Sequence, residues 1–268
     1  MTPPYVQRKV PRYSTIAFVL HYAYWNEYPK NAEKFIWGIP SKYKKAVNRE
    51  ISAITISFLY DGTRASFKVA QKVDKLFKGS PYDYLADSEY NDLVLKQNQN
   101  EIVYGKIRIR DLYYFFHGLA NFYGQYKSIY NAYNNARGGT PIERLQNALK
   151  SFPPLADDSL TTFVRLNFFL FLTAHCFDDF KVESYSLLVP VYPTNLPLCR
   201  QLRLINQDSK YSIELIHELT DNLKWFSEQH PLTYWIGILA YREAVREKDK
   251  ALKKLARKRL KKHHFKKR

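Results

Sequence analysis

Two segments of the sequence are apolar on nearly every side of a helix, and they constrain the fold more than any other feature. The first is ISAITISFLY, residues 51–60, and the second lies in SLTTFVRLNFFLFLTAHC, residues 159–176. A helix that is hydrophobic all round must be buried on every side. The second segment is shorter than the roughly 20 apolar residues of a membrane span, and it contains Arg165, Asn167 and His175. Both segments are therefore predicted to be core helices of a bundle.

Other segments have the pattern of helices that cover such a core. Apolar residues recur on one face in ASFKVAQKVDKLF, RDLYYFFHGLANFY and YSIELIHELTDNLKWF, and a last helix is predicted to begin at Pro231. In GGTPIERLQNALKSF, Thr140 and Glu143 form a capping box that starts a helix. No period-2 pattern occurs apart from the short run ESYSLLVPV. The sequence predicts an all-α, irregular helical bundle.

Composition divides the chain into three parts. Residues 1–48 are aromatic and punctuated by prolines, which predicts an N-terminal arm with at most one or two short helices. Residues 49–245 contain the core helices and are predicted to form the all-α domain. Residues 246–268 are predicted to form a basic helical tail.

Positive charge is concentrated in this tail. The chain has a net charge of +17, and residues 246–268 contribute +11 of it, with 13 Lys or Arg against two acids. Such a charge favours binding to phosphate polymers. The predicted phosphate-binding residues are Lys250, Lys253, Lys254, Arg257, Lys258, Arg259, Lys261, Lys262, Lys266, Lys267 and Arg268. The alternative is a disordered tail that only increases solubility.

Two further features each have a structural and a functional interpretation. Lys68, Lys72 and Lys75 line one face of a predicted helix, as a solvated surface or as a contact for nucleic acid. Gly138 and Gly139 precede a helix start, where backbone N–H groups bind a phosphate or simply form a cap. The solvated surface and the cap are the interpretations that the sequence favours.

No metal or cofactor site is predicted. Cys176 and Cys199 are too few for a zinc site, an iron–sulfur cluster or a disulfide framework. His117 has no second ligand at a suitable spacing and is expected to be a packed or surface residue. The low cysteine content indicates a reducing compartment, so a cytoplasmic location is predicted. No acid occurs before Glu27, which leaves an organellar address open.

Four segments, in order, resemble an uncharacterised, mainly bacterial protein family. NREISAITISFLYDGTRASFKVAQKVDKLFKGSPYDYL resembles its opening, from an "EIA-FIAS-AYG" helix to "SPYD", and RLNFFLFL resembles its "KRLNLFLRW" helix. LLVPVYPTNLPLCRQLRLI aligns without a gap to "LLIPLDTHVARLSRELGLL", and HPLTYWIGILAY resembles "DPVKYDFALFGLG". The family shares its "DTHV…R" stretch with the helix-hairpin-helix DNA glycosylases. The resemblance therefore implies a glycosylase-like fold over residues 49–244.

The chain departs from this family where the glycosylases have catalytic residues. Tyr192 stands at the position of the aspartate, Thr194 at that of a histidine and Val164 at that of a lysine. Trp235 replaces the aspartate of the closing motif. Base excision needs a placed carboxylate and sometimes a lysine. These departures predict a degenerate, filled-in site in a protein that is not an enzyme.

The predicted function is that of a pseudo-glycosylase that binds DNA or RNA through its tail, as a nucleic-acid-binding or ribonucleoprotein component. One alternative is an active glycosylase that uses a relocated acid, with Asp157, Asp158, Asp178 and Asp179 as candidates. A second is a protein-assembly subunit with partners at the N-terminal arm. A third is a surface-bound membrane protein anchored by the tail, which has only one aromatic residue, Phe265, for the purpose.

Overall fold

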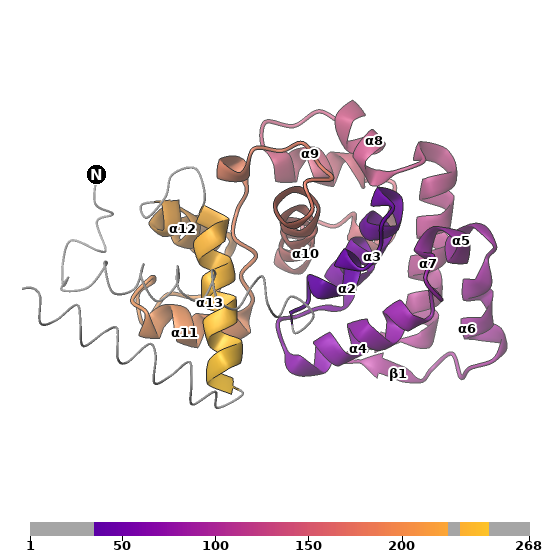
Figure 1. Ribbon diagram of the computed structural model, residues 1–268, viewed down its shortest axis with the longest axis horizontal. Coiled ribbons are helices and arrows are strands. Elements are labelled where there is room, and N and C mark those ends of the chain that lie inside the picture. The colour runs from indigo at the N-terminus through magenta and orange to yellow at the C-terminus, as the bar shows by residue number, and fades with distance from the viewer. Residues whose placement is uncertain (1–34, 225–230, 247–268) are drawn as a thin grey trace, which may run out of the picture. The chain divides into compact units, whose positions relative to one another are not determined.

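The computed structural model describes residues 35–224 and 231–246 (Figure 1). The chain divides into two compact units. The larger unit is Ile36–Thr194, and the smaller unit consists of Met1–Phe35 together with Asn195–Arg268. Most described residues are helical, which confirms the predicted all-α class. Within the described ranges, no helix has both the length and the apolar character that crossing a membrane requires.

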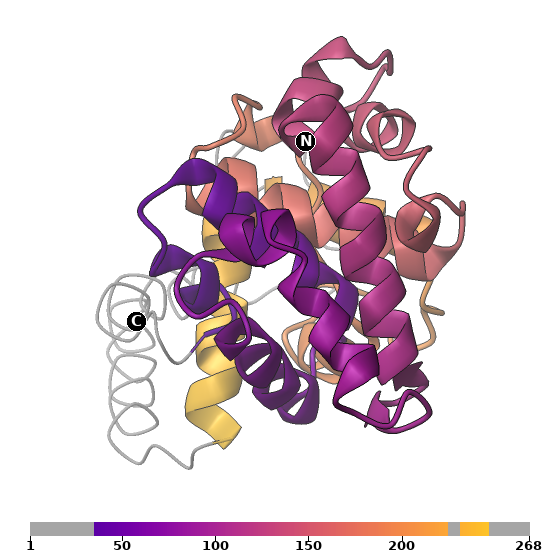
Figure 2. The ribbon, with the colours of Figure 1, turned by 90° about the vertical axis from the view of Figure 1, so that its right-hand side faces the viewer.

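The larger unit is built from nine labelled helices and one short hairpin among its described residues. Figure 2 shows it from the side of α5, α6 and α7, and α7 contacts both of the other two. The helices are α2 Gly38–Ser41, α3 Ala46–Leu59, α4 Arg64–Lys75, α5 Pro81–Ala86, α6 Asp92–Leu95, α7 Ile109–Tyr126, α8 Ile129–Asn135, α9 Pro141–Ala148 and α10 Leu160–Leu170.

Helices α3 and α10 form the centre of this unit and pack against each other (Figure 1). Every residue from 50 to 60 is buried, and α10 continues as a π-helical turn, Phe171–Cys176, whose first four residues are buried. The polar residues of α3 fit this environment because the Thr55 and Ser57 hydroxyls donate to backbone carbonyls of the preceding turn. The prediction of two core helices is confirmed.

The predicted capping box at α9 is also confirmed. Thr140 accepts a hydrogen bond from the Glu143 backbone, and the Glu143 carboxylate accepts from the backbone N–H groups of Gly139 and Thr140. Gly138 is required by close packing, since a Cβ there would lie 2.5 Å from the backbone nitrogen of Arg144. The N–H group of Gly139 therefore donates to the Glu143 carboxylate as part of the N-terminal cap of α9.

A two-stranded antiparallel hairpin lies beside α4. Its strands are β1 Ile102–Tyr104 and β2 Ile107–Arg108, joined through Gly105 at a positive φ of 55°. The Tyr104 hydroxyl donates to the Asp61 carboxylate and also bonds the Thr63 hydroxyl, so the hairpin is tied to the start of α4. Two or three residues are too short a run to show an alternating pattern, and the sequence did not indicate these strands.

The described part of the smaller unit contains α11 Leu196–Gln201, α12 Ile213–Lys224 and α13 Pro231–Arg246. Helix α13 begins at Pro231, as predicted, and it packs against α12. The Asn222 amide donates to the Leu204 carbonyl, which fixes α12 to the segment before it. Residues 1–34 of the predicted arm and residues 247–268 of the tail lie outside the described residues, and the predicted domain boundaries stay a prediction.

Candidate functional site

Residues 192–194, where the sequence predicts a filled-in site, pack against the corner between α3 and α4. Tyr192 is only 6% exposed, and its ring makes edge contacts with Tyr60 at 5.1 Å and with Phe168 at 5.7 Å between ring centres. Thr194 donates a hydrogen bond from its hydroxyl to the Gly62 carbonyl, at 3.2 Å. A buried aromatic side chain thus occupies the position at which the sequence resemblance predicts a lost aspartate.

The corner itself depends on Gly62. This residue has a φ of +86°, and a Cβ there would lie 2.4 Å from the Thr194 hydroxyl oxygen and 2.8 Å from the Cβ of Tyr192. Such distances are shorter than any normal contact, so only glycine allows residues 192–194 to pack so closely.

The other predicted former-site positions are also apolar or packed. Val164 on α10 is buried, one turn before the Phe168 ring that contacts Tyr192. Its neighbour Arg165 lies over the Phe58 ring, 4.7 Å from the ring centre, and burial lowers the pKa of Arg165. Trp235 is fully buried in α13 of the smaller unit. The structure therefore brings Tyr192 and Thr194 to one corner with the helix that carries Val164.

The acids that could replace a missing catalytic aspartate have structural partners or lie in solvent. Asp157 accepts hydrogen bonds from the backbone and hydroxyl of Ser159, and hydrogen bonding lowers its pKa. Asp158 is exposed, and Asp178 pairs with Lys181. The Asp157 carboxylate thus bonds Ser159, the residue that caps the start of α10.

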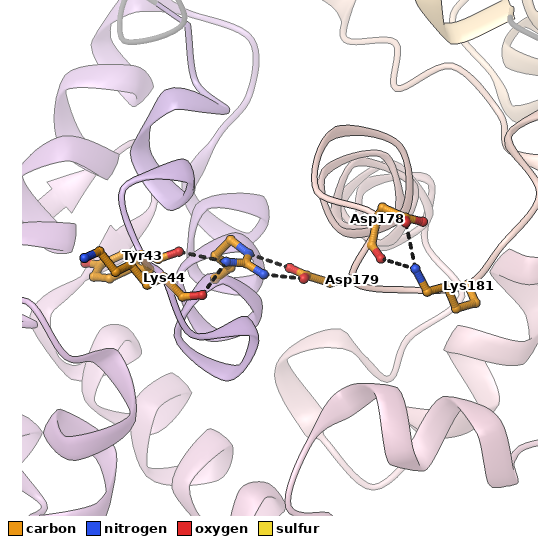
Figure 3. A network of polar contacts seen from close by, with 6 residues as sticks. Tyr43, Lys44, Asp178, Asp179 and Lys181 are labelled. Atoms are coloured by element: carbon orange, nitrogen blue, oxygen red, sulfur yellow. Dashed lines mark hydrogen bonds and ion pairs between the residues drawn. The ribbon is translucent and has the colours of Figure 1, made fainter.

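Asp179 belongs to a network centred on Arg49 of α3. The Arg49 guanidinium donates to both oxygens of Asp179, at 2.8 and 2.5 Å, and to the carbonyls of Tyr43 and Lys44, at 2.9 and 2.7 Å. Figure 3 shows Tyr43 and Lys44 on one side of this network and Asp179 on the other, while Asp178 faces Lys181. A bidentate pair of this kind fixes the loop between α2 and α3 relative to the loop after α10.

Glu50 is the buried acid that the sequence did not single out. It is 4% exposed and accepts hydrogen bonds from the Tyr123 hydroxyl and from the backbone N–H groups of Ile129 and Tyr130, at 2.7 and 3.0 Å. Burial raises the pKa of Glu50 to about 7, although these three donors oppose the shift. Its carboxylate oxygens are thus used to cap α8, which is a structural role. The sequence feature that could have indicated Glu50 is its position as an acid directly before an otherwise apolar helical run.

Asp74, the one acid of α4, also faces inward. It is 3% exposed and accepts hydrogen bonds from the Tyr43 and Ser52 hydroxyls, each at 2.9 Å, and an ion pair with Lys42 completes its contacts. These bonds join α4 to α3 and to the loop between α2 and α3. They also remove the negative charge of Asp74 from the surface.

The surface of residues 42–78 is consequently basic. This segment has nine Lys or Arg against three acids, of which Glu50 and Asp74 are buried. Residues 79–245 have 15 Lys or Arg against 18 acids. The predicted row of lysines on α4 is exposed and is extended by an arginine at its start: Arg64, Lys68, Lys72 and Lys75. The eleven predicted tail residues, from Lys250 to Arg268, lie outside the described residues.

The described residues contain no cluster of three or more His, Cys, Asp or Glu arranged to hold a metal ion. His117 is exposed and stacks on the Tyr113 ring, 5.9 Å between ring centres, as expected for a surface residue. Cys176 and Cys199 are free thiols, and burial raises the pKa of both, that of Cys199 to about 12. A thiol with a raised pKa is a poor nucleophile.

The described fold is that of an all-α protein with two buried central helices. Residues 37–169 match the model of a family described as "Protein of unknown function (DUF2400)". This match covers just under half of the chain, lies within the larger unit, and supports the predicted resemblance to a family of unknown function over that range. No curated protein and no solved structure matches the chain. The link to the DNA glycosylases stays a prediction.

Replacing Gly62 with alanine is expected to lower the free energy of unfolding by more than the cost of placing an alanine at a positive φ. The positive φ and the clash with Thr194 and Tyr192 each cost about 1–3 kcal/mol. Gly79→Ala is the matched control, because Gly79 has a φ of +97° but no atom within 4 Å of an added Cβ. Urea unfolding of the two variants gives the measurement. Equal losses of stability would contradict close packing at the corner.

Glu50 is expected to make stability depend on pH between about 4.5 and 7. The pKa of Glu50 is higher in the folded state than its ordinary value of 4.5, so the folded protein binds the proton more tightly. The contribution of Glu50 to stability is therefore complete below pH 4.5 and is lost as the pH rises through about 7. The loss is on the order of 3 kcal/mol.

The measurement is urea unfolding of the wild type and of Glu50→Gln from pH 4.5 to 8. The advantage of the wild type over the variant is expected to shrink as the pH rises. Glu101→Gln, which alters an exposed acid, is the control and is expected to follow the wild type. A constant difference between wild type and Glu50→Gln would show that burial does not raise the pKa of this carboxyl.

Proposed function

We propose that this protein binds nucleic acid without excising bases, and that it contacts mainly the phosphate backbone through its basic tail. The observation that carries this proposal is the distribution of charge: residues 246–268 have 13 Lys or Arg against two acids. Cations that neutralise phosphates release the counterions condensed on nucleic acid, and this release drives binding that does not depend on base sequence. The partner is DNA or RNA, and the protein acts as a nucleic-acid-binding or ribonucleoprotein component.

The packing of the larger unit supports the absence of base excision. A glycosylase turns a base out of the helix into a pocket and stabilises the reacting sugar with a carboxylate. Here Tyr192 and Val164 are neutral and buried at the positions that correspond to the acid and the lysine of the related proteins. Asp179, one of the four candidates for a relocated acid, is held by Arg49. A filled site of this kind fits a scaffold that binds without catalysis.

Neutralising the tail is expected to remove most of the binding. The variant carries Gln at the eleven Lys and Arg positions from Lys250 to Arg268 in the full chain, and its affinity for duplex DNA and for an RNA hairpin is measured over a salt series. For the wild type on duplex DNA, the logarithm of the binding constant falls against the logarithm of the salt concentration by about 0.9 for each phosphate contacted. The tail variant is expected to give a much shallower slope.

Two results would overturn this proposal. In the first, the wild-type protein has no measurable affinity for either polymer near physiological salt. In the second, the tail variant binds as tightly, and with the same slope, as the wild type. A preference for one polymer over the other would identify which class of nucleic acid is bound.

Base excision is expected to be absent. Incubation of the full-length protein with duplexes that contain a panel of damaged bases should release no base above the rate without protein, since no carboxylate lies at the Tyr192 position. Base release that disappears when Asp157, Asp158, Asp178 or Asp179 is replaced by asparagine would contradict this part of the account.

A further inference from the structure

The exposed face of α4 is a row of cations held on a rigid helix. Arg64, Lys68, Lys72 and Lys75 are spaced by four, four and three residues, which places them on one face of the helix over about 16 Å. The only other fully exposed residue of α4 is Ala65. Apart from Ala65, the exposed side chains of α4 are therefore all cations, while Phe67, Val69 and Gln71 are half-buried.

This row differs from an ordinary solvated helix face. Exposed helices commonly place an acid three or four residues from a lysine, and like charges at that spacing destabilise the helix. On α4 the charged neighbours at that spacing are all cations, and none of the four has an ion-pair partner among the described residues. Asp74, the one acid of the helix, is buried on the opposite side. A bound polyanion would relieve the repulsion that this arrangement creates.

The loop between α2 and α3 extends the basic surface. The ion pair between Lys42 and Asp74 places this loop beside the second half of α4. Lys44 and Lys45 on the loop are exposed, and Arg49 fixes the loop through the carbonyls of Tyr43 and Lys44. The loop and α4 are thus tied to each other by the ion pair of Lys42 with Asp74 and by the buried hydrogen bond of Tyr43 to Asp74.

We propose that α4 and the loop between α2 and α3 form a second, ordered contact for the phosphodiester backbone of nucleic acid, which rests on the proposed function of the tail. The tail supplies attraction, and α4 fixes where the polymer lies on the larger unit. Charge complementarity identifies the partner. A membrane surface fits less well, because an interfacial helix needs large, exposed apolar residues on the face that it inserts, whereas the large apolar residues beside the cations of α4, Phe67 and Val69, are half-buried.

The test compares two triple variants of the full-length protein. Lys68→Gln/Lys72→Gln/Lys75→Gln neutralises the row, and Lys96→Gln/Lys150→Gln/Lys181→Gln removes the same charge from scattered exposed positions of the same unit. Glutamine preserves helix propensity, and circular dichroism checks that each variant is folded. On duplex DNA the α4 variant is expected to lose roughly tenfold or more in affinity and to reduce the salt slope by about 2 to 3, while the control changes much less.

A second measurement on the wild-type protein does not depend on any variant. Acetylation of Lys68, Lys72 and Lys75, followed by mass spectrometry, is expected to slow when duplex DNA or an RNA hairpin is added. Acetylation of the three control lysines, Lys96, Lys150 and Lys181, is expected to change little.

The outcomes separate this proposal from the function of the tail. If the wild type binds nucleic acid but the α4 variant behaves like the control and its lysines are not protected, the surface on α4 is wrong while the tail proposal stands. If the wild type does not bind, both proposals fail. If the α4 variant loses binding to vesicles of anionic lipid but retains binding to nucleic acid, the surface recognises lipid and the inference is overturned.

Discussion

A helix buried on every side cannot carry an uncompensated charge, and the larger unit is organised around this constraint on α3. Burying a charge without partners is costly, and removing one partner of a buried pair is costly because it leaves such a charge behind. Arg49 and Glu50 lie at the start of α3, and each is fully engaged. Arg49 holds Asp179 and two carbonyls of the preceding loop, and Glu50 caps α8. The same helix provides Ser52 to bind Asp74 of α4.

This constraint also explains the character of the surface. Carboxylates have short side chains and are buried here where hydroxyl and backbone donors satisfy them, as at Glu50 and Asp74. Lysines extend their charge into water on long aliphatic chains. Between residues 42 and 78 two of the three acids, Glu50 and Asp74, therefore turn inward, while the lysines extend outward, and a surface with a positive excess results. The same bonds that stabilise the core hold the cations of α4 in place.

Local patterns in the sequence predicted the elements of the fold, and contacts between distant residues decided the rest. The core positions of α3 and α10, the capping box at Thr140 and the start of α13 at Pro231 all follow from the residues within one helix and its ends. The pair of Arg49 with Asp179 joins residues 130 positions apart, and no local pattern indicates it. The hairpin at residues 102–108 is held by Tyr104, whose bond to Asp61 is likewise distant in sequence.

At the candidate site, too, the sequence shows which residue types are present, while their contacts depend on the fold. The absence of an acid at Tyr192 is visible in the sequence, but its packing against Gly62 and Phe168 depends on the fold. The lysines of α4 were visible as a row, whereas the inward orientation of Asp74 was not, and this orientation distinguishes the row from a mixed, solvated surface.

The most direct test of the account is ultraviolet cross-linking in cells that express the full-length protein, followed by identification of the cross-linked peptides. The account predicts peptides joined to nucleotides from residues 42–78 and from residues 246–268. Protein that carries no cross-linked nucleotide, or cross-links confined to other parts of the chain, would contradict it.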